Sequence, residues 1–221
     1  MQPPASATVA AAATEQPVTL PPHGLPGLLV LPPQPRGVVL IAHGSGSDHL
    51  SPRHRHTAQV LAEAGLASLR ADMLTLQESL DRRNTFDIPL LATRLVEAAR
   101  WLQQQPGTAG LPLGALGAST GAAAALLAAH QDGAIRAVVS RGGRPDLADG
   151  ALDSLRIPVL LIVGELDTEV LQLNEQARQA LGESCELLVI PGATHLFDEP
   201  GTLEAASKAA AGWFQKQLVQ P

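Results

Sequence analysis

Short apolar runs alternate along the chain with segments in which apolar residues recur every three or four positions. Runs this short and nearly continuous are typical of strands that are buried on both faces of a sheet. The seven runs are residues 28–31, 38–42, 67–71, 113–117, 137–140, 159–163 and 187–190. The alternation predicts an α/β fold with a mostly parallel central sheet of about seven strands and helices on both faces.

The segments between the runs carry inward-facing stripes at helical spacing. The stripes are Thr57, Val60, Leu61 and Ala64; then Leu91, Leu95, Ala98 and Leu102; then Ala206, Ala210, Trp213 and Phe214. A fourth segment, residues 122–129, is apolar almost all round and predicts a central, buried helix.

The composition narrows the class of protein. The length of 221 residues fits one domain, which we place at residues 18–221 after a flexible, Ala- and Pro-rich extension over residues 1–17. Aromatic residues make up 2% and Tyr is absent, so surfaces that stack bases are excluded. The net charge of −6 argues against binding to nucleic acid or to a membrane surface. A single cysteine, Cys185, predicts neither a disulfide nor a structural zinc site, and we expect a cytoplasmic location.

The most informative segment reads Gly117-Ala118-Ser119-Thr120-Gly121, between a predicted strand and the Ala-rich helix. A serine on a sharp strand-to-helix turn needs small residues two positions before and after it, because strand and helix approach closely there. Free backbone N–H groups at the helix start favour the negative charge that develops in acyl transfer. The simpler interpretation, that Ser119 caps the helix, does not explain the flanking glycines.

A serine nucleophile needs a histidine base and a carboxylate that orients it. In folds with this strand–elbow–helix arrangement, the acid and then the histidine follow the serine along the chain. Only two histidines follow Ser119, and His130 lies on the order of 16 Å along the same helix, too far to reach the serine. His195, in a Gly-containing loop after a strand, is the remaining candidate. Asp167 follows the preceding strand and is the expected acid, with Glu165 as the alternative.

The glycine-rich loop after residues 38–42 is suited to direct backbone N–H groups inward. We assign the oxyanion hole to the backbone N–H groups of Ser45 and Thr120. His43, in the same loop, is expected to brace it by hydrogen bonding rather than to act as a second base. A phosphate-loop interpretation fails because no Gly-Lys-Ser/Thr ending is present.

Together these segments resemble the α/β-hydrolases, and in particular the dienelactone hydrolase-like branch, whose hydrolase modules occur alone or beside a phosphoribosyltransferase domain. The resemblance covers the chain from about residue 17 and implies no large cap domain. It implies a serine hydrolase that cleaves small carboxylic esters or lactones through an acyl-enzyme on Ser119, with no cofactor or metal. Dienelactone hydrolases proper carry a cysteine at the elbow where this chain has Ser119, a departure that bears on the lactone substrate and leaves ester hydrolysis intact. A thioesterase or acyltransferase with the same triad, and a non-catalytic accessory module, are the alternatives.

Three residues are candidates for substrate binding. Arg141 follows a predicted strand and Arg53 begins a helix, and a guanidinium at either place could hold a substrate carboxylate. Phe197, two residues after His195, is one of the few aromatic side chains near the site. With so few aromatics we expect a shallow, mostly aliphatic pocket for small acyl groups. The sequence also allows a homodimer.

Overall fold

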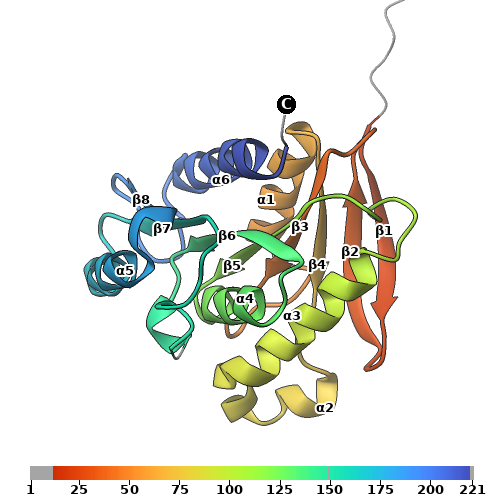
Figure 1. The fold of residues 1–221 in the computed structure, drawn as a ribbon, viewed down its shortest axis with the longest axis horizontal. Helices are drawn as coiled ribbons and strands as arrows, with labels where there is room; N and C mark the ends of the chain where they lie inside the picture. The colour runs from red at the N-terminus through yellow and green to blue at the C-terminus, as the bar shows by residue number, and fades with distance from the viewer. Residues whose placement is uncertain (1–11, 149, 220–221) are drawn as a thin grey trace, which may run out of the picture.

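The computed structural model describes residues 12–148 and 150–219 of the chain, which form eight strands in one sheet with helices between them (Figure 1). The strands are β1 (Thr14–Leu20), β2 (Leu25–Leu31), β3 (Gly37–Ala42), β4 (Leu66–Ala71), β5 (Leu113–Ala118), β6 (Ile135–Arg141), β7 (Val159–Gly164) and β8 (Cys185–Ile190). The α-helices are α1 (Pro52–Glu63), α2 (Leu76–Ser79), α3 (Ile88–Leu102), α4 (Thr120–Gln131), α5 (Thr168–Leu181) and α6 (Thr202–Leu218). Three short 3₁₀ turns are η1 (Arg82–Phe86), η2 (Pro145–Leu147) and η3 (Gly182–Ser184).

The sheet is mostly parallel, as the apolar runs predict. Its strand order is β1-β2-β4-β3-β5-β6-β7-β8, in which β1 pairs antiparallel with β2 and β2 with β4, and every other pair is parallel. Strands β3, β4 and β7 are buried at every residue. Burial on both faces explains the uninterrupted apolar sequences of β3 and β7, whereas β4 also buries Ser68 and Arg70. Because the parallel strands point the same way, the loops that follow them meet at one edge of the sheet.

The sheet divides the core into two apolar clusters, one on each face. One cluster joins the sheet to α3, α4 and α5, and the other joins it to α1 and α6, so that helices cover both faces (Figure 1). The predicted stripes on α3 and α6 are buried at every position, and the α1 stripe is buried except at Ala64, where the helix ends. The Ala-rich helix α4 is buried nearly all round, as its sequence predicts.

The N-terminal strand differs from the sequence-based prediction. Residues 14–17 belong to β1, and the sheet therefore has eight strands rather than about seven, whereas residues 1–11 lie outside the described residues. Strand β1 lies at the edge of the sheet and exposes most of its side chains, so it shows no apolar run. Its Pro17, which lacks an N–H, is tolerated at a sheet edge.

No cap domain stands over the sheet edge in the described part of the chain. Within those same residues, no helix is long and apolar enough to cross a membrane.

Candidate active site

Ser119 occupies a strained turn between β5 and α4. Its φ of 51° and ψ of −123° lie in a region that residues other than glycine rarely adopt, and such strain is concentrated at functional sites. The turn is held by the end of β6 and the segment that follows it, since the Ser119 N–H donates to the Arg141 carbonyl at 3.3 Å and the Arg144 N–H donates to the Ser119 carbonyl at 3.1 Å. The Ser119 side chain makes no capping hydrogen bond to α4, which argues against the helix-cap interpretation.

The two glycines of the elbow are required by close backbone contacts. A Cβ added at Gly117 would lie 2.3 Å from the Cα of Ala122, and one at Gly121 would lie 2.4 Å from the carbonyl oxygen of His43. Both distances are shorter than any tolerated contact with backbone atoms. Strand β5, the start of α4 and the loop after β3 are therefore packed as closely as the sequence motif predicts.

His195 and Asp167 form a directly hydrogen-bonded pair. The distance from His195 Nδ1 to Asp167 Oδ2 is 2.6 Å, and the carboxylate side chain is 14% exposed against 38% for the imidazole. Asp167 precedes α5 but makes no side-chain cap bond to it. The alternative acid, Glu165, instead accepts a hydrogen bond from the Gly192 N–H at 2.8 Å.

The end of β6 contacts both the serine and the histidine. Arg141 accepts the Ser119 N–H, and the next residue, Gly142, is so close to His195 that an added Cβ would lie 3.1 Å from its carbonyl oxygen and 3.6 Å from its Nδ1. The structure thus brings Ser119, Asp167 and His195 to the same stretch of the sheet edge, above β5, β6 and β7.

The loop after β3 lies directly against the elbow on its other side. A Cβ added at Gly44 would lie 3.0 Å from the Cβ of Ser119. The Ser45 N–H donates to Thr120 Oγ1 at 3.0 Å, so the two residues predicted to form the oxyanion hole are adjacent. His43 Nδ1 lies 3.0 Å from the Gly44 carbonyl, a contact that fits the predicted bracing role of this histidine.

The three residues expected to bind substrate point elsewhere. Arg141 is 6% exposed and its Nη1 donates to Thr57 Oγ1 at 2.9 Å beneath α1. Burial, with a smaller contribution from Arg53, lowers the pKa of Arg141 to about 10. Phe197 is 2% exposed within the core, and Arg53 pairs with Asp198 at 3.3 Å. The expectation that these side chains face the substrate is therefore not supported, because Arg141 and Phe197 are buried in the core and Arg53, at the start of α1, forms a partly exposed ion pair.

A cleft of about 700 Å³ opens beside the elbow, within the usual range of small-molecule sites of about 300–1,000 Å³. Gly44, Ser45 and Thr120 line the end of the cleft at the elbow. The apolar part of the lining is Leu25, Pro26, Met73, Leu74, Leu76 and Leu91. The described lining residues include no Phe or Trp, as the low aromatic content of the sequence suggests. The cleft is, however, larger than the shallow pocket expected from that composition.

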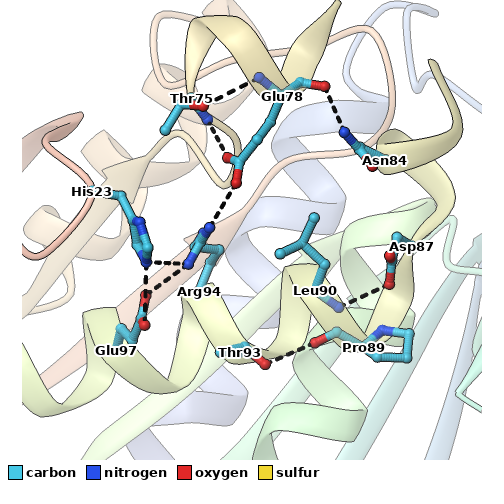
Figure 2. Close-up of polar contacts among 10 residues, drawn as sticks. All are labelled: His23, Thr75, Glu78, Asn84, Asp87, Pro89, Leu90, Thr93, Arg94 and Glu97. Atoms are coloured by element: carbon cyan, nitrogen blue, oxygen red, sulfur yellow. Dashed lines mark hydrogen bonds and ion pairs between the residues drawn. The ribbon is translucent and has the colours of Figure 1, made fainter. Parts of the chain in front are cut away.

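A polar network centred on Arg94 of α3 is shown in Figure 2. Two of its members, His23 and Thr75, line the cleft. Arg94 is 7% exposed and donates to Glu78 Oε1 of α2 at 2.8 Å, and its other terminal nitrogen contacts His23 in the β1–β2 turn. Glu78 also accepts the backbone N–H of Thr75 at 2.8 Å in a capping box. One buried guanidinium thus links α2, α3 and the β1–β2 turn.

A family model and a solved structure point to the same family. The sequence matches the dienelactone hydrolase family over residues 25–219. Over 94% of its length the chain is similar to the whole of a crystallised dienelactone hydrolase from Anabaena variabilis, with 48% identity and a TM-score of 0.89. It shares its fold, at 18% identity and a TM-score of 0.74, with the whole of Est1E from Butyrivibrio proteoclasticus over 95% of this chain.

Among curated proteins, the chain is 54% identical over 196 residues to two Mycobacterium tuberculosis proteins, from strains CDC 1551 and H37Rv, each named "Putative phosphoribosyl transferase". The match covers 88% of this chain but 44% of each relative. The chain therefore spans less than half the length of these curated relatives.

Proposed function

The chain belongs to the dienelactone hydrolase family, and from this we propose that it is a serine hydrolase that cleaves small carboxylic esters or lactones through an acyl-enzyme on Ser119. The observation that supports this most directly is the His195–Asp167 hydrogen bond of 2.6 Å at the same sheet edge as a strained serine elbow. A nucleophile that is weak at neutral pH needs such an oriented base.

In the proposed reaction, the Ser119 hydroxyl attacks the ester carbonyl while His195 Nε2 takes its proton. Asp167 holds the imidazole through Nδ1, so that Nε2 is free to accept. The protonated imidazole then gives its proton to the departing alkoxide, which leaves an ester between Ser119 and the acyl group. Water, activated by the same histidine, hydrolyses this ester and restores the serine hydroxyl.

The oxyanion of each tetrahedral intermediate would be stabilised by the backbone N–H groups of Ser45 and Thr120. The Thr120 N–H lies at the start of α4, where helix N–H groups favour negative charge. The Ser45 N–H donates to Thr120 Oγ1 in this structure, so the oxyanion would take the place of that hydroxyl. Loss of one such donor typically costs about 3 kcal/mol of transition-state stabilisation.

The transferase name of the mycobacterial relatives describes proteins more than twice as long as the matched region. We do not carry that activity over to this chain, because its matched residues are those of the hydrolase family.

The test is covalent labelling with a fluorophosphonate probe together with hydrolysis of p-nitrophenyl butyrate. The wild-type protein should be labelled and active, and Ser119→Ala should lose both properties. Ser184→Ala, which alters a serine in η3 away from the elbow, should behave as wild type. A folded wild-type protein that is neither labelled nor active would refute the proposal, and continued labelling of Ser119→Ala would place the nucleophile elsewhere.

A further inference from the structure

We propose that the cleft beside Ser119 is the acyl pocket of this enzyme, and that it takes uncharged aliphatic acyl groups while excluding acyl chains that end in a carboxylate. This inference rests on the proposed function, since it takes Ser119 as the nucleophile. It reverses the expectation of a carboxylate clamp at Arg141.

The positions of the site residues decide which part of an ester enters the cleft. The leaving oxygen must face His195, because that imidazole supplies its proton. His195 and Asp167 lie above β6 and β7, on one side of Ser119. The cleft lies on the opposite side, above the ends of β3 and β4, and begins at Gly44 and Ser45. The acyl group, which points away from the leaving oxygen, therefore extends into the cleft.

The body of the cleft is suited to an alkyl chain. Met73 and Leu91 are both 2% exposed and Leu25 is 5% exposed, so these three side chains are fixed in the core. Leu76 of α2, by contrast, is 84% exposed although it lines the cleft. An acyl chain in the cleft would cover part of that side chain and remove apolar surface from water.

The charged groups of the lining are all acidic or histidine. Asp48 and Asp72 are its two carboxylates, and the described lining residues contain no Lys or Arg. Asp72 is fixed in place, since it accepts both the backbone N–H of His49 at 2.8 Å and a contact from the His49 ring at 2.9 Å. A carboxylate brought into this cleft would lose hydration without gaining a Lys or Arg partner among the lining residues that the structure describes.

The arginines behind the cleft walls do not supply that partner. Arg94 lies behind His23 and is already paired with Glu78 at 2.8 Å and with Glu97 at 3.4 Å. Arg70, 1% exposed, is paired with Glu15. Neither guanidinium lines the cleft, so the ionisable groups that an anionic acyl chain would meet there are the two aspartates and two histidines, His23 and His43, with no Lys or Arg among the described lining residues.

Two esters with the same leaving group and the same six-carbon acyl length test the inference: p-nitrophenyl hexanoate, which is neutral, and the mono-p-nitrophenyl ester of adipic acid, which ends in a carboxylate. We expect kcat/KM to be at least about 100-fold lower for the adipate ester, because an unpaired buried carboxylate costs several kcal/mol. Leu76→Lys, which places an ammonium at the exposed wall, should lower the ratio of kcat/KM for the hexanoate ester to kcat/KM for the adipate ester at least about fivefold.

Leu80→Lys is the matched control. Leu80 is 72% exposed, directly follows α2 and is absent from the cleft lining, so this variant adds the same charge nearby without placing it in the cleft. It should leave the ratio unchanged. Equal kcat/KM for the two esters in the wild-type protein, or equal narrowing by both lysine variants, would overturn the inference. Absence of activity on both esters together with absence of fluorophosphonate labelling would refute the proposed function instead.

Discussion

His54 is a buried histidine that should make the fold sensitive to acid. It lies in the first turn of α1, is 3% exposed, and its Nδ1 has no hydrogen-bond partner among the described residues. Burial is the largest of the effects that together lower the pKa of His54 to about 2; the smaller ones are electrostatic and come from Arg141, His43, Arg53 and Arg70, in that order. The folded protein therefore holds this imidazole neutral across the usual working range of pH.

Burying a neutral His54 makes the folded protein less stable in acid, because a histidine in the unfolded chain has a pKa of about 6.5. Below that value the unfolded chain binds a proton at His54 that the folded protein does not. The free energy of unfolding therefore carries no penalty from His54 above pH 6.5 and falls as the pH drops from 6.5 toward 2. Each pH unit below 6.5 costs about 1.4 kcal/mol, which amounts to about 2.7 kcal/mol at pH 4.5.

The variant His54→Leu replaces the imidazole ring by an apolar side chain that cannot be protonated. Urea unfolding at pH 7.5 and pH 4.5 measures the free energy of unfolding of both proteins. The wild type should lose about 2.7 kcal/mol more than the variant between these two values of pH. His130→Leu, in which an exposed histidine near the end of α4 is replaced, is the matched control and should lose as much as wild type. Equal losses in wild type and His54→Leu would show that the folded protein does not hold His54 neutral at pH 4.5.

Three further predictions concern the elbow, the acid and the cleft wall. Gly117→Ala should lower the free energy of unfolding by at least about 2 kcal/mol, because the added Cβ would collide with the backbone at Ala122. Gly133→Ala is the control and should leave the stability unchanged, because its Cβ would meet nothing within 4 Å. Equal Tm values for the two variants would contradict this prediction. Asp167→Asn should lower kcat by about 10⁴-fold without changing Tm, since the imidazole of His195 would lose its orienting carboxylate; a loss below tenfold would argue against that role. Arg94→Met should destabilise the fold by about 1 kcal/mol, because it removes the hydrogen bonds to Glu78 and Glu97, which are partly exposed and can be rehydrated. It should also raise KM for a hexanoyl ester more than for an acetyl ester; equal changes in KM would show that the wall does not contact the acyl chain.

The parallel part of the sheet could be predicted from sequence because its burial is uniform. Strands such as β3 and β7 are buried on both faces and must be apolar throughout, and the α3 and α6 stripes follow from helices that have one buried face. Strand β1 could not be found in this way, since it is an edge strand with mostly exposed side chains and its partner lies across a turn.

The serine elbow could also be predicted from sequence, because the contacts that require its glycines lie mostly within neighbouring residues. Gly117 and Gly121 are needed by contacts within the strand, the turn and the helix that carry Ser119. The pairing of His195 with Asp167 rests on the order of strands along the sheet, which the chain order indicates. These inferences depend on backbone geometry that short motifs encode.

The cleft and the orientation of Arg141 could not be predicted, for a common reason. The cleft is lined by segments from the β1–β2 turn to α4, and no single segment carries a recognisable motif. The direction of Arg141 is set by Thr57, which lies 84 residues earlier in the chain. Side-chain direction at the end of a strand depends on tertiary neighbours that periodicity does not encode.

Along the sheet edge, the residues that carry the proposed chemistry lie on one side of Ser119, and the residues that line the cleft lie on the other. The loops after β7 and β8 contribute the His195–Asp167 pair, and the loops after β3 and β4 contribute most of the cleft. Mutations in the second group can therefore change the shape and charge of the cleft without touching the hydrogen bond of the first. A variant library confined to positions 73–76 would thus explore substrate preference in this fold while keeping the reactive groups constant.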